Sequence, residues 1–330
     1  MSQGSFHISD AEFWGDPFKG RDDLEDPLFA DEKDALLVDG PCKVTLDIRR
    51  TLPVAALRVS HFALATGVPF NKFAILVCSE IESGRVRVGR AVTPSEKREV
   101  PDQPSEGEGM TGEAHLLDLR KQLDLPWKPG HLAVSLILRE QISDPLHVAL
   151  ELSPGAYRDL AVEEQREKDR LAAPPPELHP KPGAALPAWG KLDDAPEVPA
   201  AAGLVLSGPR VVKLHSREPL VVKGSFRVQL PRNCFVSGER AAGIPLDPKP
   251  AALVPITLVI TGSKAPAPFR YDLVVPSWDA DASTGIAAGQ FAVDLDDAGN
   301  LRSTARTLFV YAFAGAARFG PLPIGLDEEG

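Results

Sequence analysis

Short apolar runs, separated by turns rich in Gly and Pro, recur along most of the chain. Val44, Leu46 and Ile48 alternate with polar residues, a period of two that is typical of a strand with one buried face. Comparable runs predict strands in the first half at residues 43–48, 73–78, 85–92, 114–119, 132–138 and 146–152. In the second half they predict strands at residues 204–214, 220–230, 256–261, 269–275, 290–295, 307–313 and 322–326. The pattern therefore predicts an all-β protein.

Two of these runs are apolar at every position rather than at alternate positions. Residues 308–314 carry Leu, Val and Ala on one parity and Phe309, Tyr311 and Phe313 on the other. Residues 132–138 have the same two-sided character. Strands that are covered on both faces have sequences of this kind, so we expect both segments to be buried on both sides.

The two halves of the chain resemble each other, which indicates an internal duplication. Residues 37–46 match residues 221–230, residues 112–119 match residues 289–295, and residues 144–146 match residues 320–322. Two copies of one β domain account for these matches most simply. Each copy contains six or seven short strands with turn signals between them. That spacing predicts two tandem immunoglobulin-like β-sandwich domains.

Length and composition suggest how these domains are joined. A chain of 330 residues exceeds what one hydrophobic core usually serves, and the high content of Pro (32) and Gly (27) suits short strands joined by turns. Residues 156–172 are rich in charge and predict one linker helix, which ends at the three prolines 174–176. The predicted organisation is an acidic, aromatic-containing arm (1–35), sandwich one (36–155), a helix with a Pro/Ala-rich extended linker (156–203) and sandwich two (204–330).

The N-terminal arm carries most of the net charge. Residues 1–34 hold ten Asp and Glu residues against three Lys and Arg residues, in a chain of net charge −10. No basic stripe is visible, so neither nucleic acid nor an anionic membrane is an expected partner. Large aromatic side chains in a polar arm are costly to leave in water, and we expect them to dock on a surface of this protein or of a neighbour. The candidate partner-binding residues are Phe6, Phe13, Trp14, Phe18 and Phe29.

Cysteine usage and the N-terminal sequence favour a soluble, cytoplasmic protein. Three cysteines are too few for a disulfide framework, and Cys42 and Cys78 are predicted to be core thiols. The first residues lack the basic and apolar stretches of a signal peptide, and no apolar run approaches about 18 residues. The predicted core positions are Val44, Leu46, Val77, Leu117, Leu119, Val134, Val228, Leu230, Val259, Val293, Leu295 and Val310.

Two groups of residues are candidate metal ligands. Asp279 and Asp281 offer carboxylates in one loop, which are the oxygen ligands that calcium prefers. His115, His131 and His147 lie on three predicted strands, and three imidazoles are able to hold zinc or copper. The duplicated sequence lacks an equivalent of either group, which favours a solvated turn and structural histidines. No metal or other cofactor is therefore expected.

A stretch of sandwich one resembles part of a known family. Residues 117–123, 132–139 and 146–152, and less clearly 294–326, are similar to the β-sandwich that accompanies the copper domain in tyrosinase, polyphenol oxidase and hemocyanin proteins. The copper centre of that family needs histidines on helices, commonly four positions apart. None of the seven histidines of this chain are four apart. The resemblance thus implies a companion or shielding sandwich, without oxidase activity.

No motif for a catalytic serine, a phosphate-binding loop or a zinc protease occurs, so an enzyme is not expected. The sequence favours a non-catalytic binding or assembly protein, a subunit or scaffold that contacts a protein partner or itself through the arm and the sheet faces. Two alternatives stay open. One is a metal-binding protein or an accessory module partnered with an oxidase. The other is a sandwich that binds carbohydrate or another ligand, with Trp127, Trp189 and Trp278 as candidate stacking residues.

Overall fold

The structure, a computed structural model, describes residues 35–46, 52–60, 73–91, 111–126, 128–152, 188–189, 192–213, 219–236, 244, 246–263, 268–295, 301 and 306–327. Residues 1–34 of the predicted arm, with all five of its candidate aromatic residues, and the predicted linker helix lie outside these residues. The chain divides into two compact units. The first comprises residues 1–78 and 87–173, and the second comprises residues 79–86 and 174–330.

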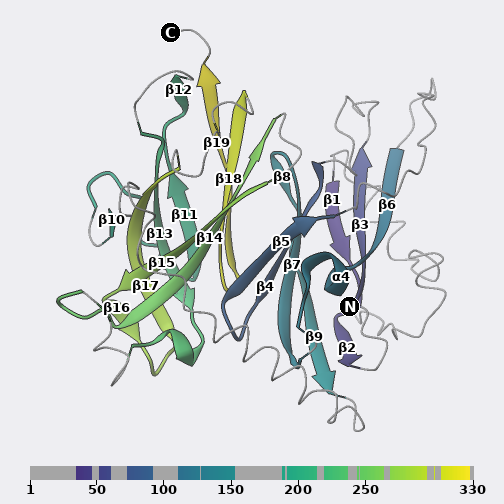
Figure 1. Cartoon of the computed structure of the whole chain (residues 1–330), viewed down its shortest axis with the longest axis horizontal. Coiled ribbons are helices and arrows are strands. Elements are labelled where there is room, and N and C mark those ends of the chain that lie inside the picture. Colours follow the sequence, from purple (N-terminus) through teal and green to yellow (C-terminus); the bar gives the residue numbers. More distant parts are fainter. Residues whose placement is uncertain are drawn as a thin grey trace. The chain divides into compact units, whose positions relative to one another are not determined.

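The first unit contains two sheets (Figure 1). The smaller sheet has the order β1-β3-β6, formed by β1 (Ala35–Asp39), β3 (Pro53–Ser60) and β6 (Thr111–Asp118). The larger sheet has the order β2-β9-β7-β4-β5, with β8 beside β7. Its strands are β2 (Lys43–Leu46), β9 (Leu146–Leu152), β7 (Gly130–Leu138), β4 (Ile75–Glu80), β5 (Arg85–Arg90) and β8 (Gln141–Ile142). Residues 79–80 of β4 and 85–86 of β5 fall in the second unit, although both strands belong to this sheet. A short helix, α4 (Leu119–Leu123), follows β6.

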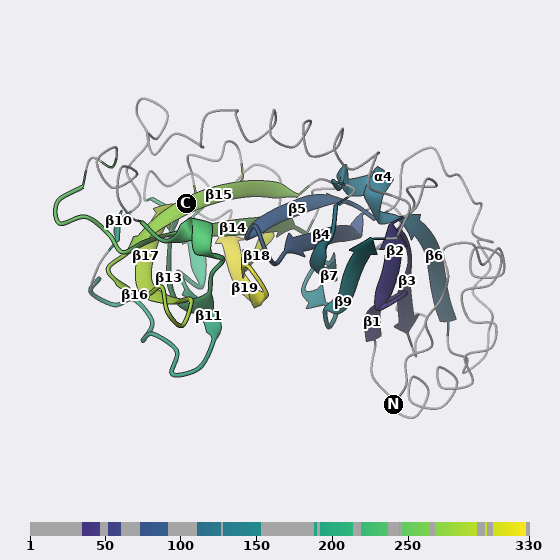
Figure 2. The ribbon, with the colours of Figure 1, turned by 90° about the horizontal axis from the view of Figure 1, so that it is seen from below.

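The second unit also contains two sheets, which form two layers in Figure 2. One has the order β10-β17-β13-β11, with β16 beside β17; its strands are β10 (Ala188–Trp189), β17 (Ile286–Asp294), β13 (Val221–Gln229), β11 (Gly203–Ser207) and β16 (Asp279–Asp281). The other has the order β12-β19-β18-β14-β15, formed by β12 (Val211–Lys213), β19 (Ala317–Asp327), β18 (Thr307–Ala314), β14 (Ala252–Gly262) and β15 (Phe269–Ser277). A 3-10 helix, η2 (Arg232–Cys234), follows β13.

The prediction of an all-β fold is confirmed, since strands in four sheets make up nearly all of the regular structure that is described. The one α-helix among the described residues, α4, has 5 residues. None of the described helices has the length and apolar character needed to cross a membrane.

The two units have the same strand order and the same strand register. The order β1-β3-β6 recurs as β11-β13-β17, and the order β2-β9-β7-β4-β5 recurs as β12-β19-β18-β14-β15. Ala35 lies opposite Val59, and Gly203 lies opposite Arg227, which places both partners 168 positions later (203 − 35 and 227 − 59). The pairs β3–β6 and β13–β17 also agree in register, with an offset of 176 positions for β6 and β17 (294 − 118).

A pair of hydrogen bonds beside the smaller sheet is also repeated. In the first unit the Leu52 amide donates to Asp118 Oδ1 at 3.0 Å, and the Leu119 amide donates to the Leu52 carbonyl at 2.9 Å. In the second unit the Leu220 amide donates to Asp294 Oδ1 at 3.1 Å, and the Leu295 amide donates to the Leu220 carbonyl at 2.9 Å. In both units an aspartate at the end of a strand thus holds the chain entering the neighbouring strand.

Each unit has its own core between its two sheets. The predicted core positions are buried in both units, except that the side chain of Leu46 lies outside the described residues. Val77 and Val259 are buried but do not belong to the core clusters between the sheets; the positions that do are Val44, Leu117, Leu119, Val134, Val228, Leu230, Val293, Leu295 and Val310. Both parities of residues 132–138 are buried, as predicted, and so are both parities of residues 308–314 except at Phe309, which is only half-buried. Cys78 is fully buried, but Cys42 is only half-buried, so its assignment as a core thiol is wrong.

Three sequence-based assignments are corrected by the strand topology. The match between residues 37–46 and 221–230 is wrong, because the first segment crosses from one sheet to the other as β1 and β2, whereas the second contains the single strand β13. The predicted strand 204–214 is in fact β11 and β12, which lie in different sheets on either side of Gly208-Pro209. Proline has no amide to continue a strand ladder. The predicted strand 114–119 ends one residue early because Asp118 caps α4 by accepting the Arg120 amide.

Candidate functional site

The candidate site lies on the outer face of the sheet β10-β17-β13-β11, the face that points away from the core of the second unit. Along β13, Phe226 and Val228 belong to the core. Because side chains alternate along a strand, Lys223, Ser225 and Arg227 stand on the opposite face. A row of two cations and one hydroxyl group therefore runs along the middle of this outer face.

An extended segment of the linker lies across this row, and we call residues 192–202 the strap. The Ser225 hydroxyl donates a hydrogen bond of 2.8 Å to the carbonyl of Glu197. The Arg227 Nε donates a hydrogen bond of 2.8 Å to the carbonyl of Pro199. Ser225 is 0% exposed although it stands on the outer face, so the strap covers it from solvent.

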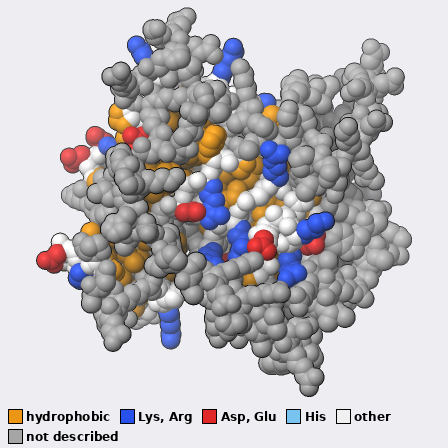
Figure 3. All heavy atoms as spheres, viewed as in Figure 1, with side chains coloured by type: hydrophobic (Ala, Val, Ile, Leu, Met, Phe, Trp, Pro, Cys, Tyr) orange, Lys and Arg blue, Asp and Glu red, His pale blue; other side chains and the backbone are white. Residues whose placement is uncertain are grey.

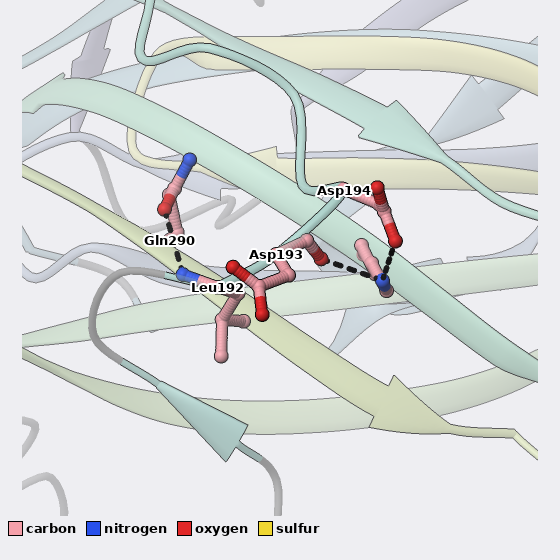
Figure 4. A network of polar contacts seen from close by, with 5 residues as sticks. Leu192, Asp193, Asp194 and Gln290 are labelled. Carbon is pink, nitrogen blue, oxygen red and sulfur yellow. Dashed lines mark hydrogen bonds and ion pairs between the residues drawn. The ribbon is translucent and has the colours of Figure 1, made fainter.

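Gln290 on β17 joins the strap to the neighbouring strand. Its Oε1 accepts the Leu192 amide at 3.1 Å, and its Nε2 donates to the carbonyl of Pro196 at 2.8 Å. The Lys223 ammonium donates to the carbonyl of Asp193 at 2.7 Å. Figure 4 shows the Gln290 side chain directed at Leu192 of the strap, and dashed lines mark this contact and those made by Asp193 and Asp194.

The contacts recognise backbone rather than side chains. Of the strap groups that these side chains bind, four are carbonyls and one is an amide. An ionic contact between Lys223 Nζ and Asp194 Oδ2 is 3.9 Å long and involves a carboxylate that is 93% exposed. Exposed ion pairs of this kind contribute little. The face therefore binds the extended strap by its main chain. Proline is tolerated in the strap because the side chains of the face donate mainly to carbonyl groups, which proline retains.

The linker prediction is partly tested by this arrangement. The sequence predicts an extended spacer in which Leu178, Leu186 and Trp189 contact a domain surface. The backbone of Trp189 pairs with Phe291 of β17, which makes β10 part of the sheet. Leu178 and Leu186 lie outside the described residues. The donors on β13 were not singled out from the sequence, although their spacing of two positions in a strand is a signal that they share one face.

Of the two carboxylates in the candidate calcium loop, that of Asp281 stabilises a turn. Asp281 Oδ1 accepts the Ser283 hydroxyl at 2.7 Å and the Ser283 amide at 2.8 Å, and its Oδ2 accepts the Thr284 hydroxyl at 3.1 Å. These hydrogen bonds, led by that from the Ser283 hydroxyl, hold the pKa of Asp281 below its ordinary value. Asp279 is exposed at the start of the same hairpin. Three of the carboxylate's acceptor positions are thus used by the turn itself.

The three candidate histidines are not brought together. His115 lies on β6 in one sheet, whereas His131 and His147 lie on β7 and β9 in the other. His131 and His147 are exposed, and strand register places them diagonally on the same face. Within the part of the chain that the structure describes, no group of three or more His, Cys, Asp or Glu side chains is placed to hold a metal ion.

The other candidate residues are dispersed or not described. The five arm aromatics and Trp127 lie outside the described residues, and the side chain of Trp189 is not placed. Trp278 is 38% exposed and donates its Nε1 hydrogen to the carbonyl of Pro248 at 2.9 Å. On the face seen in Figure 3, acidic side chains lie among the basic ones, so the described surface in view carries both signs of charge.

No protein-family model matches the chain, and a search of curated proteins finds no match either.

Proposed function

We propose that this chain is a non-catalytic assembly protein. It is built from two immunoglobulin-like sandwiches that arose by internal duplication, and the outer face of the sheet β10-β17-β13-β11 binds extended polypeptide segments. The protein partner supplies such a segment in place of the chain's own. The observation that carries the proposal is the row of Lys223, Ser225, Arg227 and Gln290, which binds the strap through its backbone.

The common topology of the two units supports the duplication. Both units share one strand order, one register and the aspartate contact at the end of β6 and β17. Independent origins would have to reproduce all three features. The matched offsets of 168 and 176 positions replace the offset of 184 that the first sequence match implies.

The placement of the strands supports the immunoglobulin-like description. In that fold, strands A, B and E share one sheet and strands C, F and G share the other. In the first unit β1, β3 and β6 occupy the places of A, B and E, and β4, β7 and β9 occupy those of C, F and G. The second unit follows the same order. Fold alone does not give function, so the function is argued from the outer face.

Chemistry at the outer face favours a protein partner over a small ligand or a substrate. Every donor in the row engages a backbone carbonyl of an extended chain, which is a feature that any protein partner can offer. Recognition of an extended chain mainly through its backbone is a recurring mode of peptide binding. The strap itself, acidic and proline-containing, indicates the type of segment that a partner would present.

Peptide binding to a vacated face tests the proposal. Residues 192–199 are replaced by a Gly/Ser segment of equal length, which keeps the backbone carbonyls but loses the extended preference of Pro196 and Pro199 and therefore loses more conformational entropy when it is ordered on the face. A fluorescent peptide with the sequence of residues 188–202 is titrated by anisotropy. We expect saturable binding to this variant. In the unmodified chain the tethered strap has an effective concentration of about millimolar, so binding of the free peptide should be much weaker.

A matched control separates the outer face from the rest of the molecule. The same strap-replaced chain carrying Arg227→Ala and Gln290→Ala loses three of the strap hydrogen bonds, and should bind the peptide at least about tenfold more weakly. Equal binding by both proteins would mean that the peptide binds elsewhere. Assembly itself is read from the native mass: a mass well above 35.4 kDa or a stoichiometric bound protein supports the proposal, and a lone monomer counts against it.

A further inference from the structure

Proline occupies two of the four strap positions whose carbonyls are bound by side chains of the sheet. Gln290 Nε2 donates to the carbonyl of Pro196, and Arg227 Nε donates to that of Pro199, both at 2.8 Å. Proline keeps its carbonyl but has no amide hydrogen, so it cannot complete a strand ladder. The sheet therefore binds a part of the strap that is unsuited to pairing as a further strand.

The same two prolines restrict the backbone over residues 195–199. A proline fixes its own φ at about −65°, and the residue before a proline is pushed toward extended conformations. Ala195 precedes Pro196 and Val198 precedes Pro199, so four of these five residues are restricted. The structure describes all five and places them in no strand or helix. Such restrictions favour a polyproline II helix, which has no internal hydrogen bonds and leaves its carbonyls available.

A turn marks the start of this extended segment. Asp194 has a φ of 58°, in the left-handed region, and the Ala195 amide donates to the Leu192 carbonyl at 3.4 Å. Just before the turn, the Leu192 amide donates to Gln290 Oε1 at 3.1 Å. Gln290 thus binds the strap on both sides of the turn, and the segment that leaves the turn continues along β13.

The spacing of the bound carbonyls agrees with a polyproline II helix. Glu197 and Pro199 are two residues apart, which is about 6.2 Å along such a helix. Their donors, Ser225 and Arg227, are two residues apart on β13, which is about 6.8 Å along a strand. An α-helical segment would advance only about 3 Å over two residues and would not span these donors.

Exposure separates the strap side chains into two groups. The two prolines and Val198 are half-buried, whereas the three acidic side chains of the strap are exposed. Exposed carboxylates contribute little through ion pairing. The prolines, in contrast, both cover the sheet and hold the carbonyls in an extended arrangement before they are bound. Proline spacing, rather than acidic charge, is therefore the feature of the strap that the face selects.

We propose, resting on the partner-binding role given above, that the outer face of β11-β13-β17 selects polyproline II segments with the spacing Pro-x-x-Pro. The partner is a protein that presents such a segment, with its carbonyls taking the places of those of Pro196, Glu197 and Pro199. A polyproline II segment is ordered before it binds and so loses little conformational entropy on the face. Residues between the two prolines are free to vary, because the face contacts their carbonyls.

Variants of the labelled 188–202 peptide, titrated by anisotropy into the strap-replaced chain, test this selectivity. Pro196→Ala with Pro199→Ala keeps every carbonyl but removes the backbone restriction, and should weaken binding about 4- to 30-fold. Glu197→Pro keeps its carbonyl and restricts the remaining residue of the segment, so it should tighten binding about 2- to 5-fold. Glu197→Gln is the matched control: it removes only the charge of an exposed side chain and should change binding by less than about twofold.

The possible outcomes separate this selectivity from the proposed function. Unchanged binding of the doubly substituted peptide, or weaker binding of the Glu197→Pro peptide, would overturn the polyproline II assignment while the face still bound polypeptide. Binding of none of the peptides would overturn the proposed function and, with it, this selectivity.

A second measurement serves if the strap-replaced chain does not fold. Pro196→Ala with Pro199→Ala in the otherwise unaltered full chain should accelerate hydrogen exchange at residues 192–195 by about 4- to 30-fold, because the strap then opens more often. Glu197→Gln in the full chain should leave this exchange unchanged. Equal exchange in the doubly substituted and unaltered chains would overturn the assignment.

Discussion

Gln290→Ala should release the strap locally without unfolding the second unit. Gln290 is the one described side chain of the face that both accepts from and donates to the strap, through the Leu192 amide and the Pro196 carbonyl. Each neutral hydrogen bond contributes about 0.5–1.5 kcal/mol, so loss of both should lower the free energy of strap opening by about 1–3 kcal/mol. Hydrogen exchange in the strap should then accelerate by about 5- to 150-fold.

Hydrogen exchange followed by mass spectrometry measures this effect, with Gln229→Ala as the matched control. Gln229 stands on the same outer face of β13, but its Nε2 donates to the carbonyl of Thr284 at 2.9 Å, in the turn between β16 and β17. Gln229→Ala should accelerate exchange in that turn and leave residues 192–199 unchanged. Equal acceleration of the strap in both variants, or no acceleration in Gln290→Ala, would refute the view that these side chains hold the strap.

Four further outcomes are expected. Asp294→Ala removes the side-chain acceptor of the Leu220 amide, and Leu220 is 0% exposed. The free energy of unfolding, measured by urea titration, should therefore fall by about 1–3 kcal/mol. Gly224→Ala should cost about 1–3 kcal/mol, measured in the same way, because the added methyl group would overlap the ring of Phe291. A carbon-13 NMR titration of Asp281 should have its midpoint below 3.8, the ordinary pKa, because hydrogen bonds in the folded turn lower the pKa of this carboxyl group. The stabilisation that the carboxylate gives is present above pH 3.8 and is lost as the pH falls through the lower pKa of the folded state. Elemental analysis of gently purified protein should find no stoichiometric metal, and a bound metal that is lost in Asp281→Ala would restore the metal-binding alternative.

The core could be predicted from the sequence because strand burial is a local signal. Val44 and Val228 are buried as their alternation with polar neighbours indicates. Strand β3, by contrast, was not predicted. Its sequence from Pro53 to Ser60 begins with Pro and contains two adjacent alanines, which have a low preference for strands. Pairing with β1 on one side and β6 on the other determines its conformation.

Sequence alone also gave the wrong offset between the two halves. Residues 37–46 and 221–230 share apolar positions and a central glycine, but a strand pattern does not say to which sheet a strand belongs. The turn at Gly40-Pro41 and that at Gly208-Pro209 each separate two strands of different sheets, and this shared turn identifies the equivalent segments. The chain crosses between the sheets at the same place in both units.

The strap illustrates what a linear pattern cannot show. Its Pro/Ala composition correctly suggests an extended segment, but its position depends on side chains that lie 28 residues away on β13 and, for Gln290, which both donates and accepts, 94 to 98 residues away on β17. These donors are ordinary polar residues on a strand, and nothing in the sequence distinguishes them from a solvated face. Their role follows only from the fold that brings them under the linker.

Anisotropy of the labelled 188–202 peptide, added to a chain whose own strap has been replaced, tests the central claim most directly. We predict saturable binding that weakens by at least about tenfold when Arg227 and Gln290 are both changed to Ala. An anisotropy that stays flat over the whole titration, in a folded protein, would contradict the claim that this face binds polypeptide.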